Sequence, residues 1–286
     1  MALKHLLRRP FVLEFRDLWV GNPFRKVRPL AWVERLERAL ERMVVRQAAA
    51  FVVVSGPMKE TLLQQYAWIP AEKVHVVPNG FDLEDFQGIE AMTFERTTIL
   101  HAGNFYEDRS AGPFLEALAA HRKRVGDHAM TALQVLFAGR PDPQVEAQIA
   151  ALDLAPWVRQ IGMVDHARML RMMLGAHILL LIPGPGKGTM TGKVFEYMAA
   201  GKPILAVAGP GCVADLVTEH RLGEVADPMD MNALEAALDK LLGNLQGLPV
   251  GRGRNSWMDT YSREAIARQV AGILVAVGSE GRAWRA

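Results

Sequence analysis

The stretch TTILHAGNFYEDRSAGPFLEAL, residues 97–118, decides the fold of this chain. It opens with β-branched and apolar residues, turns at a glycine, and continues with apolar residues spaced along one face of a helix. This order of strand, tight turn and helix is the start of a βαβ unit. The rest of the chain repeats the order.

Short apolar runs alternate with helix-period segments along almost the whole sequence. The strand-like runs are PFVLEFR (10–16), AFVVVSG (50–56), KVHVVPNG (73–80), TTILHAG (97–103), LQVLFAGR (133–140), WVRQIGMV (157–164), HILLLIPG (177–184), PILAVAG (203–209) and LGEVADP (222–228). Strands of this kind between helices indicate parallel sheets covered on both faces. The sequence therefore predicts an α/β fold built from Rossmann-like, doubly wound domains.

A polar segment without periodicity, QGIEAMTFER (87–96), predicts a domain boundary. Six strand-like runs follow it, enough for a complete Rossmann-like domain, and three precede it. We expect residues 1–90 to form a partial N-terminal domain and residues 91–250 a complete C-terminal domain. Residues 251–286 are expected to form helices that return toward the N-terminal domain.

The composition excludes several classes of protein. Apolar residues make up 50% of the chain and charged residues 22%, which is usual for globular proteins. A net charge of +2 is too small to indicate nucleic-acid binding. The most apolar run, HILLLIPG, is far shorter than the ~20 residues of a membrane-spanning helix. One cysteine, Cys212, excludes an internal disulfide and fits a reducing cytoplasm.

A glycine-rich loop runs into a helix at IPGPGKGTMTGKVFEY (182–197). Its glycines allow a ligand to approach the backbone, Lys187 and Lys193 supply positive charge, and a helix N-terminus favours anions. Ligands of doubly wound sheets bind beyond the carboxyl ends of the strands, so the loop is a candidate diphosphate site. Two alternatives stay open: a plain turn, and a surface ion pair between Lys193 and Glu196.

Several segments, in this order, resemble the retaining, nucleotide-sugar-dependent glycosyltransferases of the GT-B fold, a large bacterial group that builds surface polysaccharides and glycolipids. They are VHVVPNGFDLEDF, ILHAGNFYEDRSAGPFLEAL, LQVLFAGRPD, QIGMVDHARMLRMMLGAHILLLIP and GKVFEYMAAGKPILAV. The resemblance implies a nucleoside-diphosphate sugar as donor and a saccharide or lipid-linked saccharide as acceptor. It implies no metal ion or other cofactor, no nucleic acid, and a place in the cytoplasm with peripheral contact at the inner membrane.

The resemblance also assigns residues to the donor. Glu196 matches the second glutamate of the E-x7-E motif, whose carboxylate accepts hydrogen bonds from the ribose hydroxyls. Gly103 matches the glycine at which the backbone meets the phosphate, and Arg109 and Lys193 match cationic positions beside the leaving diphosphate. The segment Ile161–Val164 matches backbone that faces the nucleobase. The further donor-binding positions are Asn104, Gly184, Gly188, Thr191, Gly192, Ile161, Met163 and Val164.

The chain departs from the family pattern at several positions. The first glutamate of E-x7-E falls at Gly188, and Asn104 stands where relatives have an arginine of the phosphate clamp. Arg16 and Asp17 in EFRDLW match a His-Asp pair that faces the sugar, so both are candidate catalytic residues. A structural ion pair at a strand end is the alternative for them. The chain begins at what corresponds to the fourth strand of the family's N-terminal domain, which predicts an upstream start.

Two other functions stay open beside glycosyl transfer. One is a nucleotide-sugar-binding fragment without turnover. The other is a GT-B-fold nucleotide-sugar epimerase, which fits less well because those enzymes lack the KVFEYMAAGKP pattern.

The segment FRKVRPLAWVERLERALERMVVRQ (24–47) predicts an amphipathic helix. Val33, Leu36, Leu40 and Met43 share one face, with basic residues around them and glutamates interleaved. Such a helix either lies on an anionic membrane surface or covers the sheet of its own domain.

Overall fold

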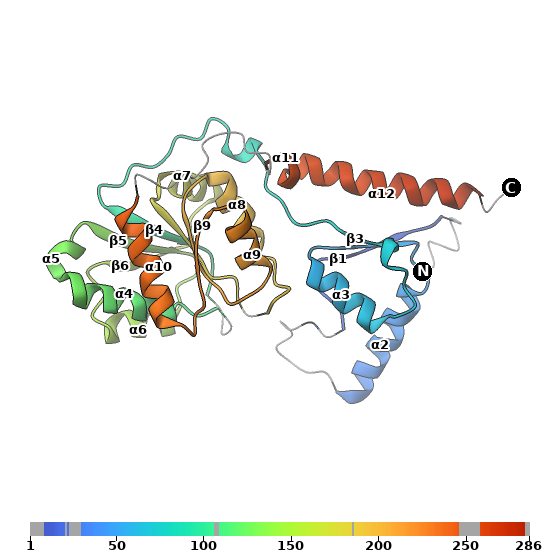
Figure 1. Ribbon diagram of the computed structural model, residues 1–286, viewed down its shortest axis with the longest axis horizontal. Helices are drawn as coiled ribbons and strands as arrows, with labels where there is room; N and C mark the ends of the chain where they lie inside the picture. The colour runs from blue at the N-terminus through green and yellow to red at the C-terminus, as the bar shows by residue number, and fades with distance from the viewer. Residues whose placement is uncertain are drawn as a thin grey trace. The chain divides into compact units, whose positions relative to one another are not determined.

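The structure is a computed structural model that describes residues 9–20, 22, 30–105, 109–184, 186–245 and 258–283. The chain forms two compact units, one of Met1–Asn79 with Arg263–Ala286 and one of Gly80–Ser262. Both are built from parallel strands and helices (Figure 1). The C-terminal helix thus belongs to the same unit as the N-terminal strands.

The first unit contains a three-stranded parallel sheet in the order β1-β2-β3. Its strands are β1 (Val12–Phe15), β2 (Ala50–Val53) and β3 (Val74–Val76), and its helices are α2 (Ala31–Val45), α3 (Gly56–Gln65), the 3-10 turn η1 (Ala71–Lys73) and α12 (Arg263–Ala283). Helix α3 begins where the Ser55 hydroxyl accepts a hydrogen bond from Met58 N. Phe15, Phe51 and Leu62 lie in the core of this unit.

The second unit contains a six-stranded parallel sheet in the order β6-β5-β4-β7-β8-β9. Its strands are β4 (Thr97–Ala102), β5 (Leu133–Ala138), β6 (Val158–Gly162), β7 (Ile178–Leu181), β8 (Ile204–Val207) and β9 (Gly223–Ala226). Successive strands move outward from β4 on one side and from β7 on the other, so the direction of winding switches between these two strands. The predicted doubly wound α/β fold is confirmed.

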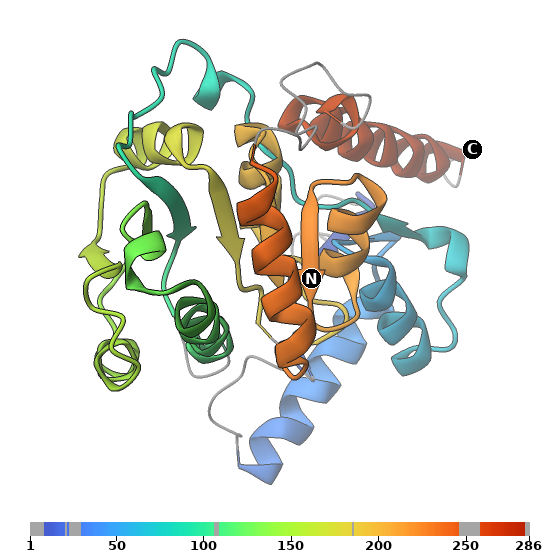
Figure 2. The same cartoon turned by 60° about the vertical axis from the view of Figure 1, so that its left-hand side comes forward.

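Helices cover both faces of this sheet (Figure 2). One face carries α4 (Gly112–Val125), α5 (Asp127–Met130), α6 (Pro143–Ala151) and α10 (Met231–Gly243), and the other carries α7 (His166–Gly175), α8 (Gly192–Ala200) and α9 (Cys212–Glu219). The unit also contains the 3-10 turn η2 (Glu84–Phe86) and the short helix α11 (Met258–Tyr261). In the described ranges, no helix has the length and apolar character needed to cross a membrane.

The helix N-termini differ in a way that bears on function. Aspartate side chains cap α6, α7 and α10: Asp142 accepts from Gln144 N at 2.8 Å, Asp165 from Arg168 N at 2.8 Å and Asp230 from Ala233 N at 3.0 Å. Helices α8 and α9 have no side-chain cap. The N–H groups of their first turns are therefore not occupied by a capping side chain, and such groups attract anions.

Candidate functional site

Strands β4 and β7 separate toward their carboxyl ends. They pair at Ile99 with Ile178 and at Leu100 with Leu179. Beyond these pairs the buried hydroxyl of Tyr197, from α8, accepts from Ala102 N at 2.9 Å and donates to Leu180 O at 3.3 Å. Burial raises the pKa of this hydroxyl, so it keeps its proton and its role as donor. The side chain thus replaces the backbone ladder at the switch point, where doubly wound sheets bind ligands.

Two cations lie against glycines at this opening. A Cβ atom at Gly103 would lie 2.6 Å from Lys193 Nζ, and one at Gly184 would lie 2.9 Å from Arg109 Nε. The φ angles are +150° at Gly103 and +88° at Gly184, in the range that favours glycine. Side chains at these positions would displace the cations. The structure therefore places Lys193 against Gly103 and Arg109 against Gly184. The role of these four residues in binding a diphosphate stays a prediction.

A buried histidine lies beneath the two cations. His101 is 2% exposed, donates from Nδ1 to Leu180 O at 2.9 Å, and stacks on Phe105 with ring centroids 4.6 Å apart. Burial is the main cause that lowers its pKa to about 4; the charges of Lys193 and Arg109 act in the same direction, and the Leu180 hydrogen bond opposes them. His101 is therefore neutral at neutral pH, and the positive charge at the site comes from other groups.

The low pKa of His101 predicts how stability depends on pH. The unfolded chain binds a proton at this histidine near its ordinary pKa of about 6.5, whereas the folded chain resists protonation down to about pH 4. The contribution is fully present above about pH 6.5 and is lost as the pH falls toward 4, by on the order of 2–3 kcal/mol. His101→Phe should flatten the dependence of unfolding free energy on pH in urea titrations. Replacing an exposed imidazole, His128→Gln, should leave it unchanged; equal slopes in all three proteins would contradict the prediction.

Glu196 lies on α8, one turn beyond Lys193, and both side chains are half-buried. Although they are three residues apart, no ion pair joins them in the described part of the chain. The surface-pair alternative is therefore not what the structure shows. Lys193 lies across Gly103, and Glu196 remains available for a ligand at the same helix N-terminus.

Asn104 has a structural role at the end of β4. Its Oδ1 accepts a hydrogen bond from Arg140 N at 2.7 Å, in the loop after β5. Beside it, Gly103 N donates to Ala138 O at 2.7 Å, and Gly139 N donates to Gly162 O at 3.1 Å. These bonds hold the ends of three neighbouring strands together. The assignment of Asn104 to donor binding stays a prediction.

The other predicted donor positions lie along the same edge of the sheet. Ile161 and Val164 are half-buried at and just beyond the end of β6 and pack against the core under α7, while Met163 is 75% exposed. Gly188 lies in the loop before α8, Thr191 is the N-cap of that helix and Gly192 is its first residue. The assignment of these positions to donor binding stays a prediction.

Arg16 and Asp17 lie in the first unit, directly after β1. Arg16 Nε donates to Glu14 Oε1 at 3.0 Å, and both side chains are exposed. The ion pair at this strand end is therefore with Glu14. The proposed catalytic roles of Arg16 and Asp17 stay predictions.

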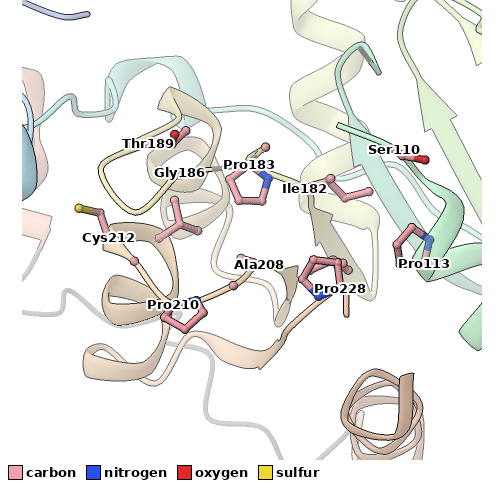
Figure 3. A pocket seen from close by; sticks show the side chains of 15 residues that line it. Ser110, Pro113, Ile182, Pro183, Gly186, Thr189, Ala208, Pro210, Cys212 and Pro228 are labelled. Atoms are coloured by element: carbon pink, nitrogen blue, oxygen red, sulfur yellow. The ribbon is translucent and has the colours of Figure 1, made fainter. Parts of the chain in front are cut away.

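A pocket of about 480 Å³ has Ser110 and Pro183 among its lining residues (Figure 3). It lies beyond the ends of β7, β8 and β9, and Gly184, which contacts Arg109, lines it. The lining residues are Ser110, Pro113, Ile182, Pro183, Gly184, Gly186, Thr189, Val207, Ala208, Gly209, Pro210, Gly211, Cys212, Val213 and Pro228. Cys212 N donates to Lys187 O at 2.9 Å and so ties the two loops of the pocket together.

Of the two loops that line the pocket, the sequence pattern was used to predict only the glycine-rich loop before α8. The second, AVAGPGCV (206–213), also follows a strand and carries glycines ahead of a helix, so the same signal was present there. Cys212 is half-buried at the pocket wall.

Doubly wound sheets bind ligands at their switch point, which is where this chain has two cations, a glycine-rich loop and an uncapped helix. Residues 96–244 match the family described as glycosyl transferases group 1, and residues 1–85 match glycosyltransferase family 4. The first match covers more than half of the chain. The chain belongs to the glycosyl transferases group 1 family, and it is a glycosyltransferase.

Two curated relatives extend over most of the chain. Alpha-maltose-1-phosphate synthase of Mycolicibacterium smegmatis is 25% identical, over 92% of this chain and 72% of the relative. Lipopolysaccharide 1,2-N-acetylglucosaminetransferase of Salmonella typhimurium is 23% identical, over 89% of this chain and 68% of the relative.

Solved structures share the fold. HepE of Anabaena in complex with UDP has a TM-score of 0.74 at 16% identity, over 96% of this chain and 74% of that one. Sucrose-phosphate synthase from Thermosynechococcus elongatus has a TM-score of 0.70 at 19% identity, over 98% of this chain and 71% of that one. These likenesses show two Rossmann-like domains of the GT-B type.

Proposed function

We propose that the protein transfers a sugar from a nucleoside-diphosphate sugar to a saccharide or lipid-linked saccharide, with retention of configuration. The observation that carries this proposal is the placement of Lys193 and Arg109 against Gly103 and Gly184, where β4 and β7 separate. Relatives named as a maltose-1-phosphate synthase and a lipopolysaccharide N-acetylglucosaminetransferase support a role in polysaccharide or glycolipid biosynthesis at the cell envelope.

The diphosphate is the part of the donor that the geometry fits best. Its negative charge grows as the bond to the sugar breaks, and preorganised cations and N–H groups stabilise that charge without rearranging. Lys193, Arg109 and the uncapped first turn of α8 would supply them. Glu196 would accept hydrogen bonds from the ribose, and the backbone of Ile161–Val164 would face the base. The reaction as proposed needs no metal ion.

The pocket beside Arg109 is the proposed place of the transferred sugar. Its volume of about 480 Å³ lies in the usual range for small-molecule sites. It adjoins the diphosphate position through Gly184, and its walls combine apolar surfaces with the hydroxyls of Ser110 and Thr189. The carboxylate that relatives place near the sugar is replaced by Gly188, so backbone groups and hydroxyls would hold the sugar here.

The remaining parts of the proposal concern the acceptor. Arg16 and Asp17, after β1 in the first unit, are proposed to face the sugar during transfer. A lipid-linked acceptor would require the protein to work in the cytoplasm at the inner face of the membrane. Relatives named as transferases and synthases favour turnover over a fragment that only binds, and over an epimerase.

Replacement of Glu196 tests the donor site. Glu196→Ala removes the acceptor for the ribose hydroxyls and should weaken UDP or GDP binding by about 1.5–3 kcal/mol, or roughly 10- to 150-fold, in calorimetric titrations. Glu219→Ala, which removes an exposed carboxylate from α9, is the matched control and should bind as the wild type does. Equal affinities for all three proteins would contradict the ribose assignment.

The same proteins test turnover. Incubation with UDP- and GDP-sugars should release nucleoside diphosphate only when an acceptor saccharide is present, and Glu196→Ala should lower that release. Binding without release would favour a fragment that only binds. Conversion of one nucleotide sugar into another without an acceptor would favour the epimerase.

A further inference from the structure

His101 carries a buried hydrogen-bond acceptor, the ring nitrogen Nε2. Its Nδ1 bonds to Leu180 O at 2.9 Å, and a carbonyl oxygen only accepts, so Nδ1 holds the single proton of the neutral ring. Nε2 therefore has a free lone pair. No residue in the described part of the chain donates a hydrogen bond to it, although the side chain is only 2% exposed. Because a buried acceptor without a donor costs free energy, we expect Nε2 to have a partner.

The orientation of the imidazole is fixed by its neighbours. The bond from Nδ1 to Leu180 O ties one edge of the ring to β7. Phe105 stacks on the face of the ring with an angle of 13° between the two planes, and Phe137 meets it edge-on with centroids 6.2 Å apart. Turning the ring over would place a carbon atom where Nδ1 now donates. A donor for Nε2 must therefore come to the nitrogen.

Lys193 is the donor best placed to reach Nε2. His101 lies on β4 two residues before Gly103, and a Cβ atom at Gly103 would lie 2.6 Å from Lys193 Nζ. Burial is the main cause of the low pKa of His101, and among the charges that lower it the ammonium of Lys193 has a larger effect than the guanidinium of Arg109. Arg109 lies instead against Gly184, in the loop after β7.

We propose that His101 is a positioning residue whose Nε2 accepts a hydrogen bond from the ammonium group of Lys193. Rotation about the last bonds of the lysine side chain moves the ammonium between the backbone of Gly103 and the imidazole. The bond uses one of the N–H donors of the ammonium and leaves the others for a diphosphate. A cation held in this way loses less freedom when the ligand binds than a lysine side chain without a partner. This role rests on the proposed function, because the diphosphate is the ligand that it serves.

Nitrogen NMR of the full, isotopically labelled chain tests the pairing directly. The resonance of His101 Nε2 should differ between the wild type and Lys193→Ala, with and without UDP, because a hydrogen bond from an ammonium group shifts an unprotonated ring nitrogen. Arg109→Ala removes the other nearby charge and is the matched control, so it should shift this resonance far less.

Two results of this measurement overturn the proposal. One is a resonance that is the same in the wild type and in Lys193→Ala, which would indicate a buried water molecule as the donor, since its bond does not depend on Lys193. The other is an equal shift in Lys193→Ala and Arg109→Ala, because the loss of any nearby charge would then explain both.

A double-mutant cycle measures the effect of the pairing on binding. His101→Phe keeps an aromatic ring against Phe105 but removes Nε2, and it should weaken UDP binding about 3- to 10-fold in calorimetric titrations, as the loss of one hydrogen bond does. In a chain that already carries Lys193→Ala, the same change should alter the UDP affinity less than about twofold. Equal losses in the two backgrounds would mean that His101 does not act through Lys193.

His101→Gln separates the acceptor from the ring. Its amide nitrogen can donate to Leu180 O while its amide oxygen accepts from Lys193, so the UDP affinity should lie within about twofold of the wild type. An affinity as low as that of His101→Phe, in a variant that urea titration shows to be folded, would contradict the proposal. A chain that binds no UDP but whose His101 Nε2 resonance depends on Lys193 would uphold the pairing and contradict the proposed function, so the two failures are distinguishable.

Discussion

Lys193→Ala and Arg109→Ala are each expected to weaken the binding of nucleoside diphosphate roughly 10- to 150-fold while leaving the bare nucleoside almost unaffected. Each change removes one hydrogen bond of a cation to a phosphate, worth about 1.5–3 kcal/mol. In the proposed site the base and the ribose do not contact these cations, so the affinity for uridine or guanosine should be unchanged. Because the leaving diphosphate gains charge in the transition state, sugar transfer should fall further, by about 100- to 1,000-fold.

The control for this prediction lies in the same loop. From the sequence, Lys187 was expected to supply charge to the candidate site together with Lys193. In the structure its side chain is exposed and its backbone is the part that contacts Cys212. The Lys187→Ala variant should therefore bind nucleoside diphosphate and transfer sugar within about twofold of the wild type, since isolated surface changes cost about 0.5 kcal/mol or less. Calorimetry with UDP, GDP and the two nucleosides decides the matter. If diphosphate and nucleoside weaken alike in the Lys193 and Arg109 variants, the cations are structural.

Much of the candidate site follows from local sequence. Gly103 and Gly184 come after strands β4 and β7, Arg109 comes just before helix α4, and Lys193 lies in the first turn of α8. In a parallel sheet the carboxyl ends of all strands lie on one edge, so such residues converge even though they are far apart in the chain. The convergence of these residues on one edge of the sheet could therefore be predicted without knowing any side-chain contact.

Other parts of the site depend on contacts that local patterns do not contain. Tyr197 reads as one more apolar residue of α8, and its role depends on how far β4 and β7 separate. His101 lies close to two cations because of the loops that carry Arg109 and Lys193, which the pattern of its own strand does not contain. Both features arise from elements nearly a hundred residues apart, which periodicity within one element cannot reveal.

Helix α2 shows a further limit. Its sequence predicts an amphipathic helix, and the structure confirms a helix at Ala31–Val45. Periodicity tells which residues share a face, but it does not tell which face a neighbouring sheet covers. In the structure Val45 and Glu41 are buried, whereas Leu36 and Leu40 stay exposed.

Replacement of Tyr197 should have the largest effect on stability. Tyr197→Ala removes a fully buried ring and should lower the unfolding free energy of the second unit by about 3–5 kcal/mol. Tyr197→Phe keeps the ring but leaves the buried Ala102 N–H without its acceptor, which should cost about 1–3 kcal/mol. Leu180 O still accepts a hydrogen bond from His101 Nδ1, so the loss of its bond with Tyr197 contributes little to the fall in unfolding free energy.

The two variants together separate packing from hydrogen bonding at the switch point. Tyr261→Phe is the control, because its hydroxyl lies 3.5 Å from His220 Nε2, too far for a strong hydrogen bond, and the change should cost less than about 0.5 kcal/mol. Urea titrations give the unfolding free energies, and calorimetry shows whether the UDP affinity also falls. It should fall in Tyr197→Phe, because Ala102 directly precedes Gly103 and the loss of its hydrogen bond loosens the backbone that Lys193 lies against. If the Tyr197→Phe and Tyr261→Phe variants have the same unfolding free energy, the Tyr197 hydroxyl does not hold the two strands together.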